Sequence, residues 1–486
     1  MKKFNQHRIE LLLGALLMVS IAGCKKFVEI DPPPTQLVTA SVFNNTATAT
    51  SAQFTIYQAM SSGDSYNVAF YSGLLSDELK VYGSNSFKIT LYQNAMGTSP
   101  SSGTFNEWNN PYKYIYQANA IIAAMQNNKS ISESIANQLT GESKFIRAYW
   151  HFYLTNIFGD VPLALTTDYT VTGKLARVPR LQVLKQVIAD LMDAQSLLNN
   201  NYLDATDTVS TTERVRPNKA AATAMLARAY LYLGDYGKDP TQYLNAEAQA
   251  SSVINNSLYS LVAITPNTSN VFAKNSNEAI WQLQIPLPSS TSATPDGNKF
   301  ILISAPSISA ISSQLYSSFE PNDLRQANWI GTYQTTTTPV VKYYYPYKYK
   351  VRTATSVTEY TMVLRLGEQY LIRAEARAQQ GSTSGALSDL NVIRNRAGLP
   401  NYSGATDKTS LLNAILHERQ VELFCEWGHR WFDLNRTGAV DVVLGPPGNV
   451  CASKGGVWST DGHQKLAPIP LTEIQADPNL IQNPGY

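Results

Sequence analysis

Residues 371–400, LIRAEARAQQGSTSGALSDLNVIRNRAGLP, carry the pattern that decides the fold. The stretch places a small residue, a turn residue, a second small residue, a large apolar residue and a closing proline at Ala374, Gly381, Ala386, Leu390 and Pro400. Small residues let two helices approach closely, and a glycine adopts the backbone conformation that ends a helix. The stretch therefore predicts two antiparallel helices joined by a short turn.

The same spacing occurs earlier, in ARAYLYLGDY at residues 227–236. Ala227 takes the small position, and we expect Gly234 to end the helix. Both units fit the tetratricopeptide repeat, in which each helix pair leaves an apolar face that a neighbouring pair must cover. Helical periodicity marks further helices at residues 111–127, 142–158, 180–199, 217–234, 243–256 and 408–427. We predict a mainly α protein with a superhelical scaffold of tetratricopeptide-like helix pairs.

Residues 260–360 change in character. They are rich in Ser, Thr, Pro and Tyr and contain short alternating runs such as EAIWQLQI and KYYYPYKYK. Runs of this length are typical of short strands bounded by turns. This stretch therefore predicts loops and a few short strands that pack against the helical scaffold, forming a loop-rich face suited to binding a ligand.

The first 23 residues have the organisation of an export signal. A basic start, MKKFNQHRIE, precedes the apolar run LLLGALLMVSIA, which is too short to span a bilayer. The sequence Ile21-Ala22-Gly23-Cys24 follows and resembles the lipobox of bacterial lipoproteins, which implies that Cys24 is acylated, for instance with palmitate, and becomes the first mature residue. Residues 24–40 are then the lipidated cysteine and a proline-stiffened tether. An ordinary secretory signal followed by an unrelated cysteine is the alternative.

Charge and cysteine content exclude several functions. The formal net charge of +2 comes entirely from the expected signal peptide, through Lys2, Lys3, Arg8 and Glu10. A neutral mature chain has no basic field for nucleic acid. No complete dinucleotide, phosphate-loop or zinc motif is present, so we expect no cofactor and assign no metal site, and the sequence leaves open whether the loops bind calcium. After Cys24, only Cys425 and Cys451 remain, and the sequence leaves open whether they pair.

Five blocks in chain order resemble the SusD/RagB family. They are ESKFIRAYWHFYLTNIFGDVPL, LRLGEQYLIRAEARAQQG, LSDLNVIRNRAGLP, LHERQVELFCEWGHRWFDLNRTG and KLAPIPLTEIQADPNLIQNPGY. The resemblance implies a lipid-anchored protein on the surface of the outer membrane. Such proteins bind nutrients, usually glycans, and cover a TonB-dependent transporter of the SusC type. It also implies one integrated fold with an N-terminal helical part at 41–260 and a C-terminal part at 261–486.

The segment GHRWFDLNR, residues 428–436, mixes charged and aromatic residues as a catalytic pocket would. In the resembling family this block belongs to the scaffold. We therefore expect Trp431 and Phe432 to fill a crevice between helices, and Arg430, Asp433 and Glu422 to satisfy one another. Neither a nucleophile nor a second metal ligand accompanies His429, so we expect a protein that is not an enzyme.

Sugar binding needs aromatic faces for stacking and polar side chains for the hydroxyl groups. Aromatic residues that we expect to be exposed in loop-rich stretches are Tyr66, Tyr71, Tyr82, Phe87, Tyr92, Trp329 and Tyr333. The preferred ligand-binding set is Tyr66, Tyr82, Tyr92, Trp329 and Tyr333, with Asn67, Asn85 and Asn94 as polar neighbours. By contrast, we expect Trp108, Trp150 and Trp281 to belong to the core.

The sequence supports one main function and two alternatives. The main hypothesis is a non-catalytic surface lipoprotein that captures glycans or oligosaccharides for a SusC-like transporter. The first alternative is a surface lipoprotein that binds peptides or proteins in the concave groove of its repeats. The weaker alternative is a surface glycosidase, for which paired acids such as Asp77 with Glu78, or Glu320 with Asp323, would serve.

Overall fold

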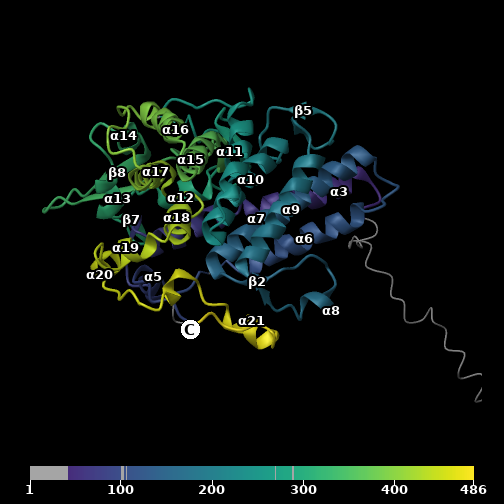
Figure 1. The fold of residues 1–486 in the computed structure, drawn as a ribbon, viewed down its shortest axis with the longest axis horizontal. Helices are drawn as coiled ribbons and strands as arrows, with labels where there is room; N and C mark the ends of the chain where they lie inside the picture. Colours follow the sequence, from purple (N-terminus) through teal and green to yellow (C-terminus); the bar gives the residue numbers. More distant parts are fainter. Residues whose placement is uncertain (1–41, 100–102, 106, 267, 269, 287–288) are drawn as a thin grey trace, which may run out of the picture.

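The chain is mainly helical, with short strands between some of the helices (Figure 1). A computed structural model describes residues 42–486, apart from 100–102, 106, 267, 269 and 287–288. The expected signal peptide, Cys24 and the tether up to residue 40 lie outside the described residues.

The helices are α3 (Thr46–Met60), α4 (Asp64–Leu75), α5 (Ser86–Tyr92), α6 (Asn109–Met125), α7 (Glu133–Phe158), α8 (Tyr169–Thr172), α9 (Arg180–Leu197), α10 (Lys219–Gly237), α11 (Thr241–Ile254), α12 (Pro295–Phe300), α13 (Ser313–Ser318), α14 (Leu324–Trp329), α15 (Leu366–Gln379), α16 (Thr383–Arg396), α17 (Lys408–Leu423), α18 (His429–Thr437), α19 (Val440–Leu444), α20 (Val450–Ser453) and α21 (Leu471–Ala476). The strands are β1 (Leu79–Val81), β2 (Val161–Pro162), β3 (Arg177–Val178), β4 (Tyr202–Leu203), β5 (Ser210–Thr211), β6 (Ala279–Leu283), β7 (Ser309–Ile311), β8 (Ile330–Gln334), β9 (Lys342–Pro346) and β10 (Thr361–Arg365).

The scaffold is a continuous series of packed helices. Neighbours contact one another in the order α6, α7, α9, α10, α11, α15 and α16, and α17 packs on α15 and α16. Ala374, Ala386 and Leu390 are all buried where α15, α16 and α17 meet, as the repeat pattern requires. Each helix pair buries its apolar face on the next, which confirms the predicted scaffold of tetratricopeptide-like helix pairs.

The two repeat glycines have different roles. Gly381 follows α15 with φ of +80°, so it is the turn residue that the sequence predicts. Gly234 does not end its helix, because α10 continues to Gly237. A Cβ at position 234 would lie 2.8 Å from the Tyr243 ring of α11. The glycine at 234 is therefore required for close packing between helices rather than for a turn.

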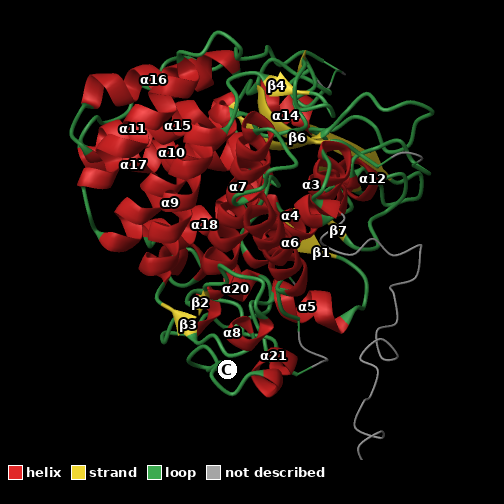
Figure 2. Ribbon diagram, turned by 90° about the vertical axis from the view of Figure 1, so that its right-hand side faces the viewer, coloured by secondary structure: helices red, strands yellow, loops and turns green. Residues whose placement is uncertain are grey.

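The described strands form five two-stranded sheets, which are β1–β7, β2–β3, β4–β5, β6–β10 and β8–β9. All five are antiparallel, and β6 and β10 are buried along their whole length. Figure 2 shows α10, α11, α15, α16 and α17 gathered on one side, with α12, β1, β7 and many loops on the other. This arrangement confirms the predicted loop-rich face with few short strands.

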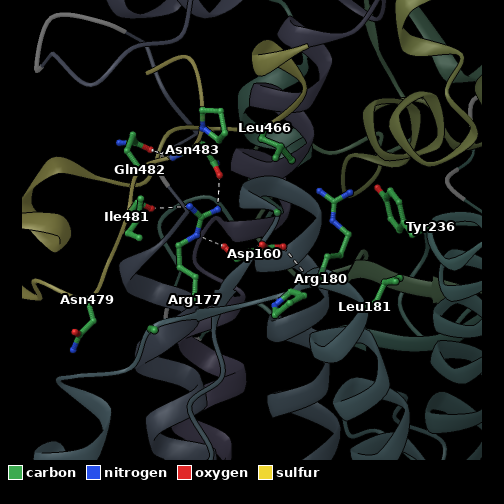
Figure 3. Close-up of a pocket in the computed structure, with 14 residues that line it drawn as sticks. Asp160, Arg177, Arg180, Leu181, Tyr236, Leu466, Asn479, Ile481, Gln482 and Asn483 are labelled. Atoms are coloured by element: carbon green, nitrogen blue, oxygen red, sulfur yellow. Dashed lines mark hydrogen bonds between the residues drawn. The ribbon is translucent and has the colours of Figure 1, made fainter. Parts of the chain in front are cut away.

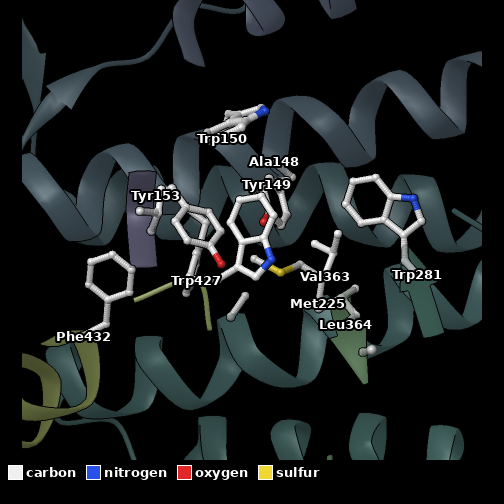
Figure 4. Packing of buried hydrophobic residues seen from close by; sticks show 14 of the residues in the cluster. Ala148, Tyr149, Trp150, Tyr153, Met225, Trp281, Val363, Leu364, Trp427 and Phe432 are labelled. Carbon is white, nitrogen blue, oxygen red and sulfur yellow. The ribbon is translucent and has the colours of Figure 1, made fainter. Parts of the chain in front are cut away.

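The core is unusually aromatic where α7 meets the C-terminal half (Figure 4). The Tyr149 ring makes edge contacts with Trp281 and Trp427 at centroid distances of 5.7 and 5.6 Å. The indole N–H of Trp427 donates a 2.7 Å hydrogen bond to the carbonyl of Met362. Trp108, Trp150 and Trp281 are buried as predicted, and so are Trp431 and Phe432.

The charged residues of the GHRWFDLNR segment also belong to the scaffold. Arg430 donates two hydrogen bonds to Asp77, at 2.8 and 2.7 Å, and Asp433 accepts one from Arg419 at 2.7 Å. All four side chains are buried. The predicted scaffold role therefore holds, but the predicted mutual pairing of Arg430, Asp433 and Glu422 is wrong, because each of the three pairs with other residues.

Glu422 lies at the centre of a separate buried ion-pair network. Its carboxylate accepts from Arg365 at 2.6 Å, from Arg325 at 3.0 Å and from Arg396. Burial alone would raise the pKa of Glu422, but the guanidinium groups of Arg396, Arg365 and Arg325 outweigh burial and hold it well below its usual range. The network joins β10, α14, α16 and α17.

Other features concern the thiols and possible ion or membrane contacts. Cys425 and Cys451 are buried free thiols, and Cys425 lies in a turn after α17 rather than in the predicted helix. Within the described part of the chain, no His, Cys, Asp and Glu side chains form a group of three or more that could hold a metal ion. No described helix combines the length and apolar character needed to cross a bilayer.

Candidate ligand-binding site

An open pocket of about 560 Å³ lies on the loop-rich face. It is formed by α4, α5 and α12, by the segment 301–309 that leads into β7, and by Arg352. Because β1 and β7 pair antiparallel, with Leu79 opposite Ile311, the end of this segment is held beside the chain that connects α4 to α5. The scaffold thus brings together three segments that are far apart in the sequence.

Aromatic rings of α4 and α5 line this pocket. Tyr66 stacks on Phe70 at 5.4 Å and packs against Phe300 of α12 at 4.8 Å. Nearer the opening, the half-buried Tyr71 and Phe87 rings meet edge to face, with their centroids 6.2 Å apart. Such a pair offers apolar surface against which a sugar ring can pack.

Polar groups surround these rings. Asn85 caps α5 by accepting a 3.1 Å hydrogen bond from the backbone N–H of Lys88, and this cap fixes the start of the helix that carries Phe87. Asn298 of α12 donates to the carbonyl of Arg352 at 3.0 Å, which holds the far wall. No Asp, Glu or His side chain is among the described residues that line the pocket.

Three carboxyl groups are buried close to the pocket without lining it. Burial raises the pKa of Asp64 to about 7, that of Glu107 to about 8 and that of Asp296 to about 7. One oxygen of each carboxyl group is buried and has no hydrogen-bond partner, an arrangement that favours the protonated form. The region beneath the pocket therefore carries less negative charge than three carboxylates would give it.

The structure places three of the predicted binding residues at this pocket and the others elsewhere. Tyr66, Asn67 and Asn85 line it, although Tyr66 lies on a helix and is only 7% exposed. Tyr82 packs edge to face on Tyr343, which pairs in register with Tyr333 on the neighbouring strand. These three tyrosines lie outside the pocket lining, but the backbone N–H of Tyr82 bonds to the carbonyl of Ile308 in the pocket wall.

Tyr92 and Asn94 are held by the scaffold near α20. The Tyr92 ring lies 5.3 Å from the ammonium group of Lys454. The amide of Asn94 is fully buried and donates to the carbonyl of Leu75 at 2.8 Å. Asn94 is therefore inaccessible to a ligand and does not act as the polar neighbour of a sugar platform that the sequence predicts.

Trp329 is not the exposed loop aromatic that the sequence predicts. Its side chain, at the end of α14, is only 3% exposed and contacts Phe272 edge to face at 5.6 Å. The charged groups of Lys348, Arg365 and Arg396 lie 5.1, 5.9 and 5.4 Å from its ring. Trp329 therefore stabilises the surroundings of the buried ion-pair network.

A conservative substitution tests this assignment. We expect Trp329→Phe to lower the free energy of unfolding by about 1–2 kcal/mol, because the smaller ring leaves a void in a buried site. Affinity for a glycan that binds the wild type is expected to stay within about twofold, since the ring is not part of the pocket lining. Chemical denaturation and calorimetric titration of the same preparation give the two values. An unchanged stability with a large loss of affinity would contradict the assignment.

Two other hollows lie elsewhere on the protein. The larger, of about 720 Å³, lies between α9 and the C-terminal segment (Figure 3). Its Arg177 donates to the carbonyls of Asp160 and Ile481, both at 2.7 Å, and Arg180 stacks on Tyr236 at 4.2 Å. These groups are engaged in holding the chain terminus. A smaller groove lies between α6 and α21 and includes two acidic side chains, Glu473 and Asp477.

Several pocket residues have no signal in the sequence that would mark them as binding residues. Lys299 and Arg352 lie in stretches of mixed polar residues without periodicity or motif, and only the folded chain brings them beside α4. Tyr71 and Phe87 were recognisable as loop-region aromatics but not as members of the preferred set. Their place in the pocket depends on how α4 packs on α5 and α12.

Comparison with known proteins gives consistent results across the chain. Residues 26–231 match the family model described as starch-binding and associating with the outer membrane, and residues 277–486 match the model of the SusD family. SusD-like protein P2 of Formosa agariphila is 26% identical over 433 residues, covering 78% of this chain and 80% of that protein.

Solved structures share the fold over nearly the whole length. A putative sugar binding protein from Bacteroides vulgatus superposes with a TM-score of 0.71 at 25% identity, covering 91% of this chain and 99% of its own. A laminarin binding SusD-like protein gives a TM-score of 0.71 at 22% identity, covering 91% and 100%. Since the two family models follow one another along the chain, and the helix-pair scaffold matches these structures, the chain belongs to the SusD/RagB family.

Proposed function

We propose that this protein is a lipid-anchored protein of the outer-membrane surface that binds glycans without cleaving them and delivers them to a SusC-type TonB-dependent transporter. The observation that carries the proposal is the pocket in which Tyr71 and Phe87 stand beside amide and hydroxyl side chains. Rings with polar neighbours suit the apolar faces and hydroxyl groups of a sugar. The names of two structural relatives, one sugar binding and one laminarin binding, support the same ligand class.

The lining of the pocket supports binding rather than hydrolysis. A glycosidase of the common type needs two carboxyl groups that face the scissile bond from opposite sides. No described lining residue is acidic, and the carboxyl groups of Glu107 and Asp296 are buried outside the lining. The acids considered from the sequence are engaged elsewhere, since Asp77 pairs with Arg430, and Asp323 pairs with Arg325.

Calorimetric titration of the full chain in detergent against neutral and acidic oligosaccharides and a set of peptides tests the proposal. We expect binding of at least one glycan, with no release of reducing sugar in the same tubes after prolonged incubation. Binding of peptides alone would replace this function with peptide capture, and release of reducing sugar would replace it with hydrolysis. Co-purification with a SusC-type transporter, in cells that express both, tests the delivery step.

Phe87→Ala tests which surface binds the glycan. We expect the dissociation constant to rise about tenfold, because the variant removes one ring of the edge-to-face pair at the opening of the pocket. Phe87 is half-buried, so the variant should fold, and thermal unfolding checks this. The matched control is Tyr116→Ala, which removes an exposed ring, 55% accessible, in the groove between α6 and α21. Loss of affinity in the control instead would move the site to that groove.

The anchor is tested by Cys24→Ala. In a lipoprotein, the acyl chains on this cysteine hold the protein at the membrane. We expect the variant to move from the membrane fraction to the soluble fraction, with an unchanged content of folded protein. Fractionation followed by immunoblotting measures the shift. Membrane attachment equal to that of the wild type would show that the anchor is not at Cys24.

A further inference from the structure

The pocket on the loop-rich face has an uneven distribution of charge. Lys88 of α5, Lys299 of α12 and Arg352 all line it, and they come from three separate segments. No ion pair involves any of these three cations among the described residues, and no acidic residue lines the pocket. The groove between α6 and α21 differs, because its lining includes the acidic Glu473 and Asp477.

Arg352 is the most informative of the three. Its Nε atom is buried and has no hydrogen-bond partner. Every other described arginine donates from its guanidinium group to an oxygen atom of the protein; Arg177 and Arg214, for example, donate to backbone carbonyl groups. An unpaired buried donor is costly, and a ligand oxygen would remove that cost.

The two lysines stand over aromatic rings. The ammonium group of Lys299 lies 4.4 Å from the Tyr66 ring centroid, and that of Lys88 lies 6.0 Å from the Phe70 ring centroid. Contact with a ring holds a lysine in place but leaves its three donors free for a ligand. The pocket thus combines an aromatic surface with cations that have hydrogen bonds to spare.

The buried acids oppose this positive charge only in part. Burial lowers the pKa of Lys299, and the charges of Asp296 and Glu107 raise it in part, while the charge of Asp64 adds to the raised pKa of Glu107. Burial raises the pKa of each of these three carboxyl groups to about 7 or 8, so each is partly protonated near neutral pH. None of the three acids lines the pocket and all three are buried, whereas the three cations do line it and Lys299 is exposed. A ligand in the pocket therefore contacts the cations rather than the acids.

We infer that this pocket selects oligosaccharides that carry anionic groups, either the carboxylates of uronic acids or sulfate esters, through Arg352, Lys299 and Lys88. The inference rests on the proposed glycan-binding function of the same site. Guanidinium and ammonium groups bind both kinds of oxyanion through charge-assisted hydrogen bonds. The aromatic pair of Tyr71 and Phe87 then provides the surface for the neighbouring sugar ring.

Matched pairs of ligands test the inference on the full chain in detergent. One pair is oligogalacturonate and its methyl ester, and the other is a sulfated galactan oligosaccharide and its desulfated form. We expect the anionic member of at least one pair to bind about tenfold tighter or more at low ionic strength, with a preference that shrinks as salt rises. The pair that shows the preference identifies the anionic group.

Variants then assign the preference to the three cations. We expect Arg352→Gln and Lys299→Gln each to reduce the ratio of anionic to neutral affinity several-fold, and the double variant to abolish it. Arg352→Lys, which keeps the charge, should restore part of the ratio. The control Lys113→Gln, an exposed lysine on α6 outside the pocket, should leave the ratio unchanged. Thermal unfolding of each variant excludes misfolding as the cause.

The outcomes separate the two proposals. Equal affinity for the members of both pairs, or a preference that survives in the double variant, would overturn the anionic selectivity and leave glycan binding intact. If no oligosaccharide of either kind binds to the folded protein, the proposed function fails, and the inference fails with it.

Discussion

Glu422→Gln is expected to lower the free energy of unfolding by about 3–5 kcal/mol, the usual cost of removing one partner from a buried ion-pair network. Glu422 is fully buried and accepts hydrogen bonds from Arg325, Arg365 and Arg396. A neutral amide cannot balance three guanidinium groups, and its NH₂ group would point donors at donors. Chemical denaturation followed by intrinsic tryptophan fluorescence measures the change.

The control is Glu320→Gln, which also removes a carboxylate that pairs with an arginine but does so at a more exposed position. Glu320 also accepts from an arginine, Arg394, at 2.5 and 3.1 Å, but its side chain is 38% exposed. We expect Glu320→Gln to cost less than about 1 kcal/mol, because water screens an exposed pair. If Glu422→Gln and Glu320→Gln lowered the free energy of unfolding by the same amount, burial would not strengthen the Glu422 network.

Glu107→Gln is expected to change how stability depends on pH. Burial raises the pKa of Glu107 to about 8, above the value near 4.3 expected for an unfolded chain. The folded protein therefore keeps a proton that the unfolded chain releases, and the associated stability is lost as pH rises from about 5 to about 8. The Glu107→Gln variant does not lose this stability as pH rises, because glutamine has no carboxyl proton to release. We expect it to resemble the wild type at pH 5 and to be more stable by roughly 2–3 kcal/mol at pH 8.

Denaturation curves at several pH values measure this difference. The control is Glu133→Gln, an exposed carboxyl group at the start of α7, which should shift stability by no more than about 0.5 kcal/mol at every pH. If the free energies of unfolding of the wild type and of Glu107→Gln change in parallel from pH 5 to pH 8, Glu107 is ionised throughout that range, and the prediction is wrong.

The scaffold could be predicted because its information is local. Ala374 and Ala386 show within a short stretch that two helices touch, and the helical periodicity shows where neighbouring helices lie. The error at Gly234 has the same origin. A glycine near the end of a helix usually marks its end, whereas the ring of Tyr243, which requires the glycine here, lies on the following helix.

The pairing of buried charges could not be predicted in the same way. Arg430 and Glu422 are close in sequence, but the partner of Arg430 is Asp77, which lies far from it along the chain. Two charged residues that are close in sequence form an ion pair only when their side chains point toward each other in the folded chain. Ion pairs such as Arg430–Asp77 and Arg228–Glu368 instead join elements that the sequence does not show to be adjacent.

The candidate site was predictable only in part for a related reason. Aromatic side chains in the stretch from Tyr66 to Tyr92 indicated the region of the candidate pocket, and some of them line it. Exposure could not be inferred from the sequence, since Trp329 is covered by Phe272 and surrounded by cations from three other segments. Arg352 enters the site through contacts that only the folded chain creates.

The most direct test of the central claim is a crystal structure of the protein with an oligosaccharide that binds it. We expect a sugar ring to pack against Tyr71 and Phe87, with its polar groups within hydrogen-bond distance of Asn298 or of the cations Lys299 and Arg352. Sugar bound in the groove between α6 and α21, or in the hollow of Arg177 and Arg180, with this pocket occupied only by water, would contradict the assignment of the site.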